Sequence, residues 1–218
     1  LRSITVSRKF SRQMQVWEAG TARVRLDNTD GALSPDNLSG PYVSVGVTQI
    51  RPGRPFRLTM SYGGTAVRLF VGYSTAWDEG WIQAGTNAGD AWVDVSAADE
   101  WSILSGIDGV EVAAVGAGDT FGARLHRILD AAGRRDPRSI ATGVTTMQAT
   151  TLAGGPTSDI KATVESEGGA AWIDRNGTFR ASDKYSLSED AVSNTVQATF
   201  GDGGTGSTAC HLMELGFP

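Results

Sequence analysis

Alternation of apolar and polar residues dominates the first hundred positions of the chain. Between Thr21 and Asp27 every second residue, Ala22, Val24 and Leu26, is apolar, and charged residues lie between them. Successive side chains of a strand point to opposite faces, so this run predicts a strand with one buried face. The same pattern predicts further short strands over residues 4–7, 14–17, 54–62, 65–73 and 91–96.

A hairpin is predicted where Gly63 and Gly64 separate two of these runs. Two glycines between alternating segments favour a tight turn with positive φ. We expect the apolar sets of the two strands to oppose one another, with Phe56, Leu58 and Met60 against Val67, Leu69 and Val71. Residues 77–81 then predict a loop or bulge, and residues 99–104 predict a short helical turn that closes the β unit.

The apolar period becomes helical after Asp119, where Thr120 or Asp119 can cap the start and Gly133 can end the helix. One face of this helix is apolar: Phe121, Leu125, Ile128, Leu129 and Ala132. A second helix is predicted from Thr157 to Glu167, between Pro156 and Gly168. A hairpin follows over 170–174 and 178–181, around an Asn-Gly turn, and a further strand is predicted over 192–200.

One part of the chain carries a specific likeness to a known family. Residues 19–28 read AGTARVRLDN, residues 34–37 read SPDN, and residues 51–56 read RPGRPF. With Gly72-Tyr73 at the end of the next hairpin, this run resembles the N-terminal part of the tail-tip or baseplate hub proteins of long-tailed bacteriophages, often labelled minor tail proteins. Leu33 stands where that family has an aromatic residue, and a weaker likeness extends to about Phe200.

The resemblance implies a mainly β fold with an α+β part. A barrel-like or split-barrel β domain is expected over 1–116, and a small domain of two helices and a hairpin over 117–190. Residues 191–218 are expected to return as strands toward the β domain, in a chain truncated relative to the family. The period changes described above agree with this division.

The resemblance also implies a function, which is structural and not enzymatic. The protein is expected to be a virion component, a hub at the distal end of a phage tail that links the tail tube to tip or receptor-binding parts. Hub proteins of this type are homotrimers assembled in the host cytoplasm. The expected partners are therefore further copies of the chain and other tail proteins.

Composition excludes several other classes. The chain of 218 residues has a net charge of -5, and nucleic-acid binding is not expected because phosphate contacts need a concentrated basic surface. Its densest basic cluster, Arg134, Arg135 and Arg138, is interpreted as a solvated loop. No apolar run approaches the roughly 20 residues that cross a bilayer, so no membrane span is expected. Cys210 is the only cysteine, which excludes an intrachain disulfide and favours a buried small hydrophobe.

Patterns typical of cofactor and metal sites are incomplete. The spacing Gly201-x-Gly203-x-x-Gly206 matches a dinucleotide fingerprint, but its acidic residue belongs about 20 positions later and the sequence given ends before that. A calcium loop with Gly31 at its sixth position would use Leu26 as its first ligand, and an aliphatic side chain cannot coordinate calcium. A looser oxygen site from Asp27, Asp30 and Asp36 stays open. His126 and His211 are the only histidines, too few for a multi-histidine site. We therefore predict no cofactor and no metal.

Neighbouring carboxylates are interpreted as solvated or edge-protecting side chains rather than a catalytic pair. Glycan cleavage needs two convergent carboxylates. Glu165 and Glu167 lie two apart on a helix and point in different directions. The remaining candidates lie in predicted turn or edge settings: Asp78 with Glu79, and Asp90 with Asp94.

Tryptophans offer the strongest candidate contact residues. Trp77, Trp81, Trp92 and Trp101 fall within one 25-residue window. Trp77, Trp81 and Trp92 are predicted to form a subunit interface or to contact glycans, since exposed aromatic rings suit both. A second hydrophobic layer beneath the loops is the simpler alternative. A carbohydrate-binding tail adhesin and a non-catalytic fragment of a tail-associated cell-wall hydrolase therefore stay open as alternatives to the hub.

Overall fold

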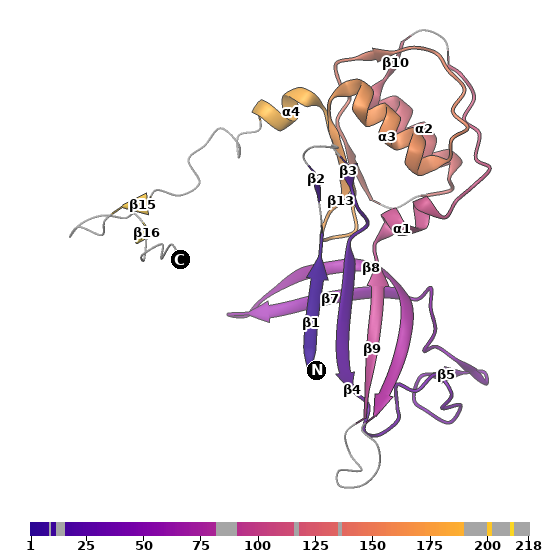
Figure 1. The fold of residues 1–218 in the computed structure, drawn as a ribbon, viewed down its shortest axis with the longest axis vertical. Coiled ribbons are helices and arrows are strands. Elements are labelled where there is room, and N and C mark those ends of the chain that lie inside the picture. Colours follow the sequence, from indigo (N-terminus) through magenta and orange to yellow (C-terminus); the bar gives the residue numbers. More distant parts are fainter. Residues whose placement is uncertain are drawn as a thin grey trace.

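The computed structural model of the chain describes residues 1–8, 10–11, 16–81, 91–115, 118–134, 137–189, 200–201 and 210–211. It shows a curled antiparallel sheet and, beyond one end of it, a smaller unit of helices and short strands (Figure 1). The mainly β fold with an α+β part is therefore confirmed. The sheet curls as a half-barrel, and the strands described do not close a barrel.

Five strands build the curled sheet in the order β1-β4-β9-β8-β7, and every neighbouring pair is antiparallel. Their bounds are Ser3–Ser7 for β1, Thr21–Asp27 for β4, Ala91–Ala98 for β9, Thr65–Trp81 for β8 and Pro55–Tyr62 for β7. Strand β4 has the predicted bounds, with Ala22 and Val24 buried. Val93 and Val95 of β9 are fully buried opposite it.

Strand β8 is longer than the sequence pattern predicts, and it bends through the sheet. Its first half pairs with β7, whereas residues from Tyr73 onward pair with β9. The expectation of a loop or bulge at 77–81 is therefore wrong. Trp77 lies opposite Val95 and Trp81 opposite Ala91, so backbone pairing with β9 overrides the turn-like composition of this segment.

The β7–β8 hairpin forms at Gly63 and Gly64 as predicted, but its register differs from the expected one. A register shift between Leu58 and Thr59 brings Phe70 opposite Leu58 and Gly72 opposite Phe56. A bulge reverses the side-chain alternation beyond it, so Phe70 faces the core and is fully buried. Met60 does lie opposite Val67, but it is exposed near the tip of the hairpin.

Arg8 joins the two sides of the curl. Its guanidinium donates to the backbone oxygen of Leu69 at 2.9 Å and lies 5.5 Å from the centre of the Phe70 ring. A hydrogen bond and a cation–π contact from one side chain therefore connect the end of β1 to β8. The small core enclosed there contains Ala22, Phe70 and Ala97.

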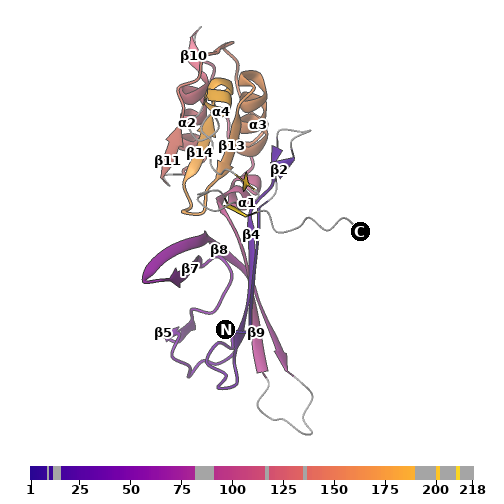
Figure 2. The same ribbon diagram turned by 90° about the vertical axis from the view of Figure 1, so that its left-hand side faces the viewer.

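The second unit places helices against a three-stranded sheet (Figure 2). Its elements are α1 (Glu100–Ser105), α2 (Phe121–Ala131), α3 (Pro156–Glu167), β11 (Arg138–Ile140), β13 (Ala170–Ile173) and β14 (Phe179–Ser182). Both predicted helices and the predicted hairpin are present, with Thr120 as the N-cap of α2 and Gly168 in a left-handed C-cap after α3. Strand β11, parallel to β14, was not predicted.

The larger hydrophobic core lies in this second unit. Phe121, Leu125, Ile128 and Ile160 are fully buried in it. Residues that directly follow β9 also belong to it, because Trp101 of α1 stacks on Phe179 with ring centres 6.1 Å apart. Helix α1 therefore packs into the second unit rather than ending the first.

Short elements complete the described part of the chain. They are β2 (Phe10–Ser11), β3 (Val16–Trp17), β5 (Val43–Ser44), β6 (Val47–Thr48), β10 (Asp119–Thr120), β12 (Thr146–Met147), α4 (Lys184–Glu189), β15 (Phe200–Gly201) and β16 (Cys210–His211). Most of the strand predicted over 192–200 lies outside the described residues. No helix in the described ranges is long and apolar enough to span a membrane.

The close packing of Gly72 gives a test of the fold. A Cβ at this position would lie 2.2 Å from the backbone oxygen of Ala98, so Gly72→Ala must displace β8 from β9. Overpacking of this kind lowers the free energy of unfolding by about 1–3 kcal/mol. Urea denaturation should show that loss, while Ala66→Val, at an exposed position of the same strand, should stay within about 0.5 kcal/mol of wild type.

Candidate functional site

The three candidate tryptophans lie close together in the sheet but not on one face. Paired residues of neighbouring strands share a face, and Trp77 and Trp81 pair with Val95 and Ala91. Trp92 pairs with Gly80 and Asp27, on the opposite face. A single aromatic platform from all three rings is therefore not formed.

Each of the three rings has a different environment. Trp77 is half-buried and donates its indole N–H to the backbone oxygen of Arg51 at 3.2 Å, which ties the long loop after β4 to the sheet. The ring of Trp92 lies against Gly80, where a Cβ would approach it to 2.5 Å. Trp81 is 69% exposed. Trp81 is thus the ring most available to a partner.

A charged ladder covers the face that carries Trp92. Asp94 accepts hydrogen bonds from Arg25 at 2.7 and 2.8 Å and from Arg23 at 3.0 Å, and the Arg25 guanidinium lies 5.0 Å from the Trp92 ring centre. The hydrogen bonds from Arg25 are the largest cause of the lowered pKa of Asp94. Asp94 is only 5% exposed on a central strand, so its interpretation as a solvated edge residue is wrong.

The junction between the two units contains a buried carboxylate, Asp99. It accepts the backbone N–H of Gly20 at 2.8 Å and that of Trp101 at 3.1 Å, so it caps α1 and binds the residue before β4 at the same time. Burial raises its pKa to about 6, although both hydrogen bonds and the nearby Arg8 act in the opposite direction. A Cβ on Gly20 would lie 2.6 Å from the carboxylate, which explains the glycine.

The next residue, Glu100, is also buried and forms an ion pair with Arg134. Arg134 donates in addition to the hydroxyl of Tyr73 at 3.4 Å, which connects the end of α2 to β8. Arg138 donates to Asp130 at 2.7 Å with its side chain largely buried. The interpretation of this basic cluster as a solvated loop is therefore wrong for Arg134 and Arg138, and Arg135 lies outside the described residues.

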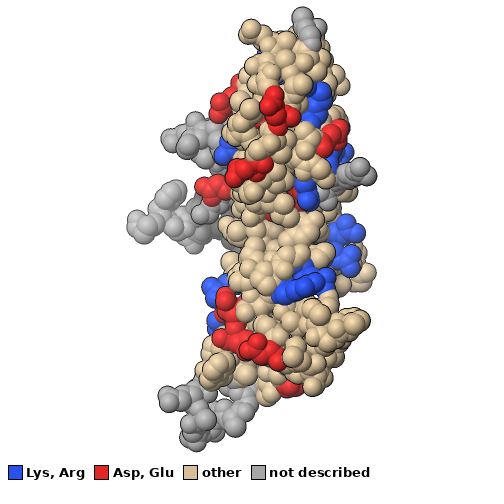
Figure 3. Space-filling view, turned by 90° about the vertical axis from the view of Figure 1, so that its right-hand side faces the viewer, with Lys and Arg blue, Asp and Glu red and all other residues tan. Residues whose placement is uncertain are grey.

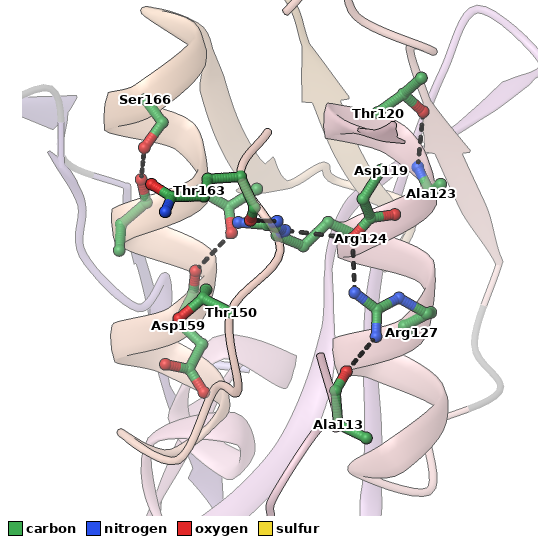
Figure 4. A network of polar contacts seen from close by, with 12 residues as sticks. Ala113, Asp119, Thr120, Ala123, Arg124, Arg127, Thr150, Asp159, Thr163 and Ser166 are labelled. Atoms are coloured by element: carbon green, nitrogen blue, oxygen red, sulfur yellow. Dashed lines mark hydrogen bonds and ion pairs between the residues drawn. The ribbon is translucent and has the colours of Figure 1, made fainter. Parts of the chain in front are cut away.

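Within the second unit, buried charges hold loops to helices (Figure 4). Asp119 accepts from Arg124 at 3.1 Å and from Arg127 at 2.5 Å, while Arg127 also donates to the backbone oxygen of Ala113. Glu167 accepts the backbone N–H groups of Val144 and Thr145, each at 3.1 Å. The interpretation of Glu167 as a solvated residue is therefore wrong.

The described residues do not assemble a catalytic or metal-binding group. They contain no cluster of three or more His, Cys, Asp or Glu side chains able to hold a metal ion. Asp27 accepts from Arg2 at 2.6 Å, and Asp30 accepts the backbone N–H of Ala32. His126 is exposed on α2. The Gly203–Gly206 part of the glycine run and the side chains of Cys210 and His211 lie outside what the structure describes.

A groove of about 430 Å³ lies where the β7–β8 hairpin meets the second unit. It is lined by Pro55, Phe56, Arg57, Val71, Gly72, Tyr73, Glu100 and Gly177. A Cβ on Gly177 would lie 2.8 Å from Val71, so the glycine permits the close approach of the two units here. No sequence pattern indicated this groove, because its walls come from residues more than 100 positions apart.

Solved structures that match this chain include two tail proteins at low identity. One is the 43 kDa tail protein of prophage MuSo2 from Shewanella oneidensis, with a TM-score of 0.48, 13% identity, and coverage of 82% of this chain and 49% of that one. The other is the tail protein from Neisseria meningitidis MC58, with a TM-score of 0.49, 10% identity, and coverage of 75% and 42%. The chain spans less than half the length of each. No protein-family model and no curated protein matches it.

The buried Asp99 gives a pH-dependent prediction. A carboxyl pKa raised by folding contributes stability that is fully present below its unfolded value of about 3.8 and is lost as the pH rises through about 6. Relative to Asp99→Asn, which does not titrate, wild type should lose about 1 kcal/mol of unfolding free energy between pH 5 and pH 7. Chemical denaturation of both proteins across this range measures the difference, and parallel curves would contradict the assignment.

Proposed function

We propose that this chain is a structural component of a phage tail, and within the tail the hub at its distal end that links the tube to tip or receptor-binding parts. The observation that carries the proposal is the run over residues 19–56, which resembles the hub family at 19–28, 34–37 and 51–56 and departs from it at Leu33 and over 45–50. In the structure, this run comprises the second strand of the sheet, β4, the loop after it, and the first residues of β7.

The residues of this run determine the shape of the loop after β4. Asn28 accepts the backbone N–H of Leu33 at 2.8 Å, and Asn37 donates to the backbone oxygen of Gly31 at 3.0 Å, so two amide side chains fold the loop upon itself. The Pro-Gly turn then returns the chain to the sheet, where the N–H of Gly53 donates to the oxygen of Ser74 at 2.7 Å. These residue types are needed for a loop shape and not for a reaction.

The character of the described surface supports an assembly role. Acidic and basic side chains are interspersed over the face in Figure 3, without the single-sign field that nucleic-acid binding requires. Strands β1 and β7 lie at the two edges of the sheet, and unpaired strand edges are places where further chains add. A homotrimer that binds other tail proteins is part of the proposal.

Location in the particle tests this function directly. We expect gold-labelled antibodies raised against the chain to mark the distal tip of tailed particles released from cells that carry the gene. Electron microscopy of particles treated with pre-immune serum is the control. Labelling along the tail shaft or on the capsid would contradict the hub, and tailed particles that exclude the chain altogether would contradict any tail role.

A carbohydrate-binding adhesin is the second candidate, because Trp81 is 69% exposed. The hub proposal predicts no specific glycan binding by the chain on a glycan array. Binding that disappears in Trp81→Ala but persists in Met60→Ala, which removes another exposed apolar side chain, would favour the adhesin instead. Both candidates predict that the chain leaves the turbidity of a bacterial cell-wall suspension unchanged. A hydrolase would lower it.

A further inference from the structure

The hairpin of β5 and β6 and the segment just before it carry an exposed apolar surface, which we call the apolar tip: Leu38, Tyr42, Val45 and Val47. It stands away from the curled sheet at the right of Figure 1. Residues 37–50 include no charged side chain. Val45 is 98% exposed at the end of the turn, so it contributes no packing to its own chain. Clustered exposed apolar residues of this kind mark contact sites.

The backbone at Val45 indicates that this side chain has a use outside the chain. Its φ is +51°, and among the described residues it is the only non-glycine with positive φ. A β-branched side chain is disfavoured there, whereas Gly or Asn would relieve the strain. Val45 pays the cost of this backbone strain without packing against its own chain. A partner that binds the valine side chain would account for the strain.

The groove between the β7–β8 hairpin and the second unit is apolar, like the tip. Pro55, Phe56 and Val71 give it apolar walls, and its volume of about 430 Å³ accommodates several aliphatic side chains. Its buried carboxylate, Glu100, is already paired with Arg134. An uncharged tip therefore brings no further charge into this groove, and the exposed Arg57 that also lines it can keep its guanidinium in water.

We propose that the apolar tip of one copy of this chain inserts into the groove of a second copy. The two surfaces differ, so the contact is heterologous, and its repetition closes a ring of three when each copy is rotated by a third of a turn from the last. The ring deepens the proposed function by giving the hub trimer its contact. A lipid surface is a poorer occupant, because the chain has a net charge of -5 and the tip contains one aromatic residue and no basic one.

Two charged variants test the two surfaces of this contact one at a time. Val45→Asp places a charge on the tip at a backbone conformation that Asp tolerates, and Val71→Lys places one in the groove at a half-buried position. In light scattering across a concentration series, wild type should reach three times its mass of 22.9 kDa, and each variant should remain at one-third of that. The apolar controls Val45→Leu and Val71→Ile should stay trimeric.

Mixing the two charged variants gives the decisive result. One partner keeps an intact groove and the other an intact tip, so an equal mixture should contain heterodimers although neither variant associates alone. Disulfide trapping supports this independently of the charged variants. Val45→Cys in one population and Arg57→Cys in another, both with Cys210→Ser, should yield a mixed disulfide on oxidation, and Glu79→Cys in place of Arg57→Cys should not.

The outcomes distinguish this contact from the proposed function. A trimer that survives both charged variants overturns the tip contact and leaves the hub trimer standing. A wild-type monomer at every concentration, with no mixed disulfide, overturns both the contact and the trimer, while tip labelling of particles still decides the location. Flotation of wild type, but not Val45→Asp, with phosphatidylcholine vesicles would assign the tip to lipid and overturn the contact between copies.

Discussion

The position of the two units depends on one buried carboxylate. Asp99 is the last residue before α1, and its two oxygens accept the N–H groups of Gly20 and Trp101. The same side chain thus fixes the start of β4 and the first turn of a helix that packs in the other core. Its burial is unfavourable for the charged form, and the backbone donors around it, together with the nearby Arg8, act against that effect. Glu100 and Arg134 then connect this junction to α2.

The curl of the sheet follows from irregularities in β8. The pairing of β8 is irregular at two places: opposite Leu58 and Thr59 of β7, and between its own Ser74 and Ala76. At each place β8 has one more residue than its partner strand, and such bulges bend a strand and increase its twist. The bend takes the β7–β8 hairpin away from β9 and toward the second unit, where the groove forms. The open half-barrel and the groove therefore have one structural origin.

Elements set by local periodicity were predictable from the sequence, and features set by distant partners were not. Strand β4 and helices α2 and α3 follow from spacing alone, and their caps follow from Thr120 and Gly168. The continuation of β8 through Asp78 and Gly80 depends on pairing with β9 and on the Trp92 ring over Gly80. The roles of Arg134 and Glu167 depend on partners 34 and 22 or more residues away. Only the uncharged segment 37–50 gave a visible sign of the apolar tip.

Three buried carboxylates of this chain have structural roles, so its exposed surfaces are a better guide to its function than its charged side chains. Asp94, Asp119 and Glu100 are buried, and each is paired with arginine. A carboxylate that is fully engaged by guanidinium groups is a poor general base and has no position left for a metal. These three carboxylates therefore join loops, helices and strands. In the described part of the chain, an exposed apolar hairpin, a groove and two strand edges are available for recognition, and surfaces of that kind bind other protein surfaces.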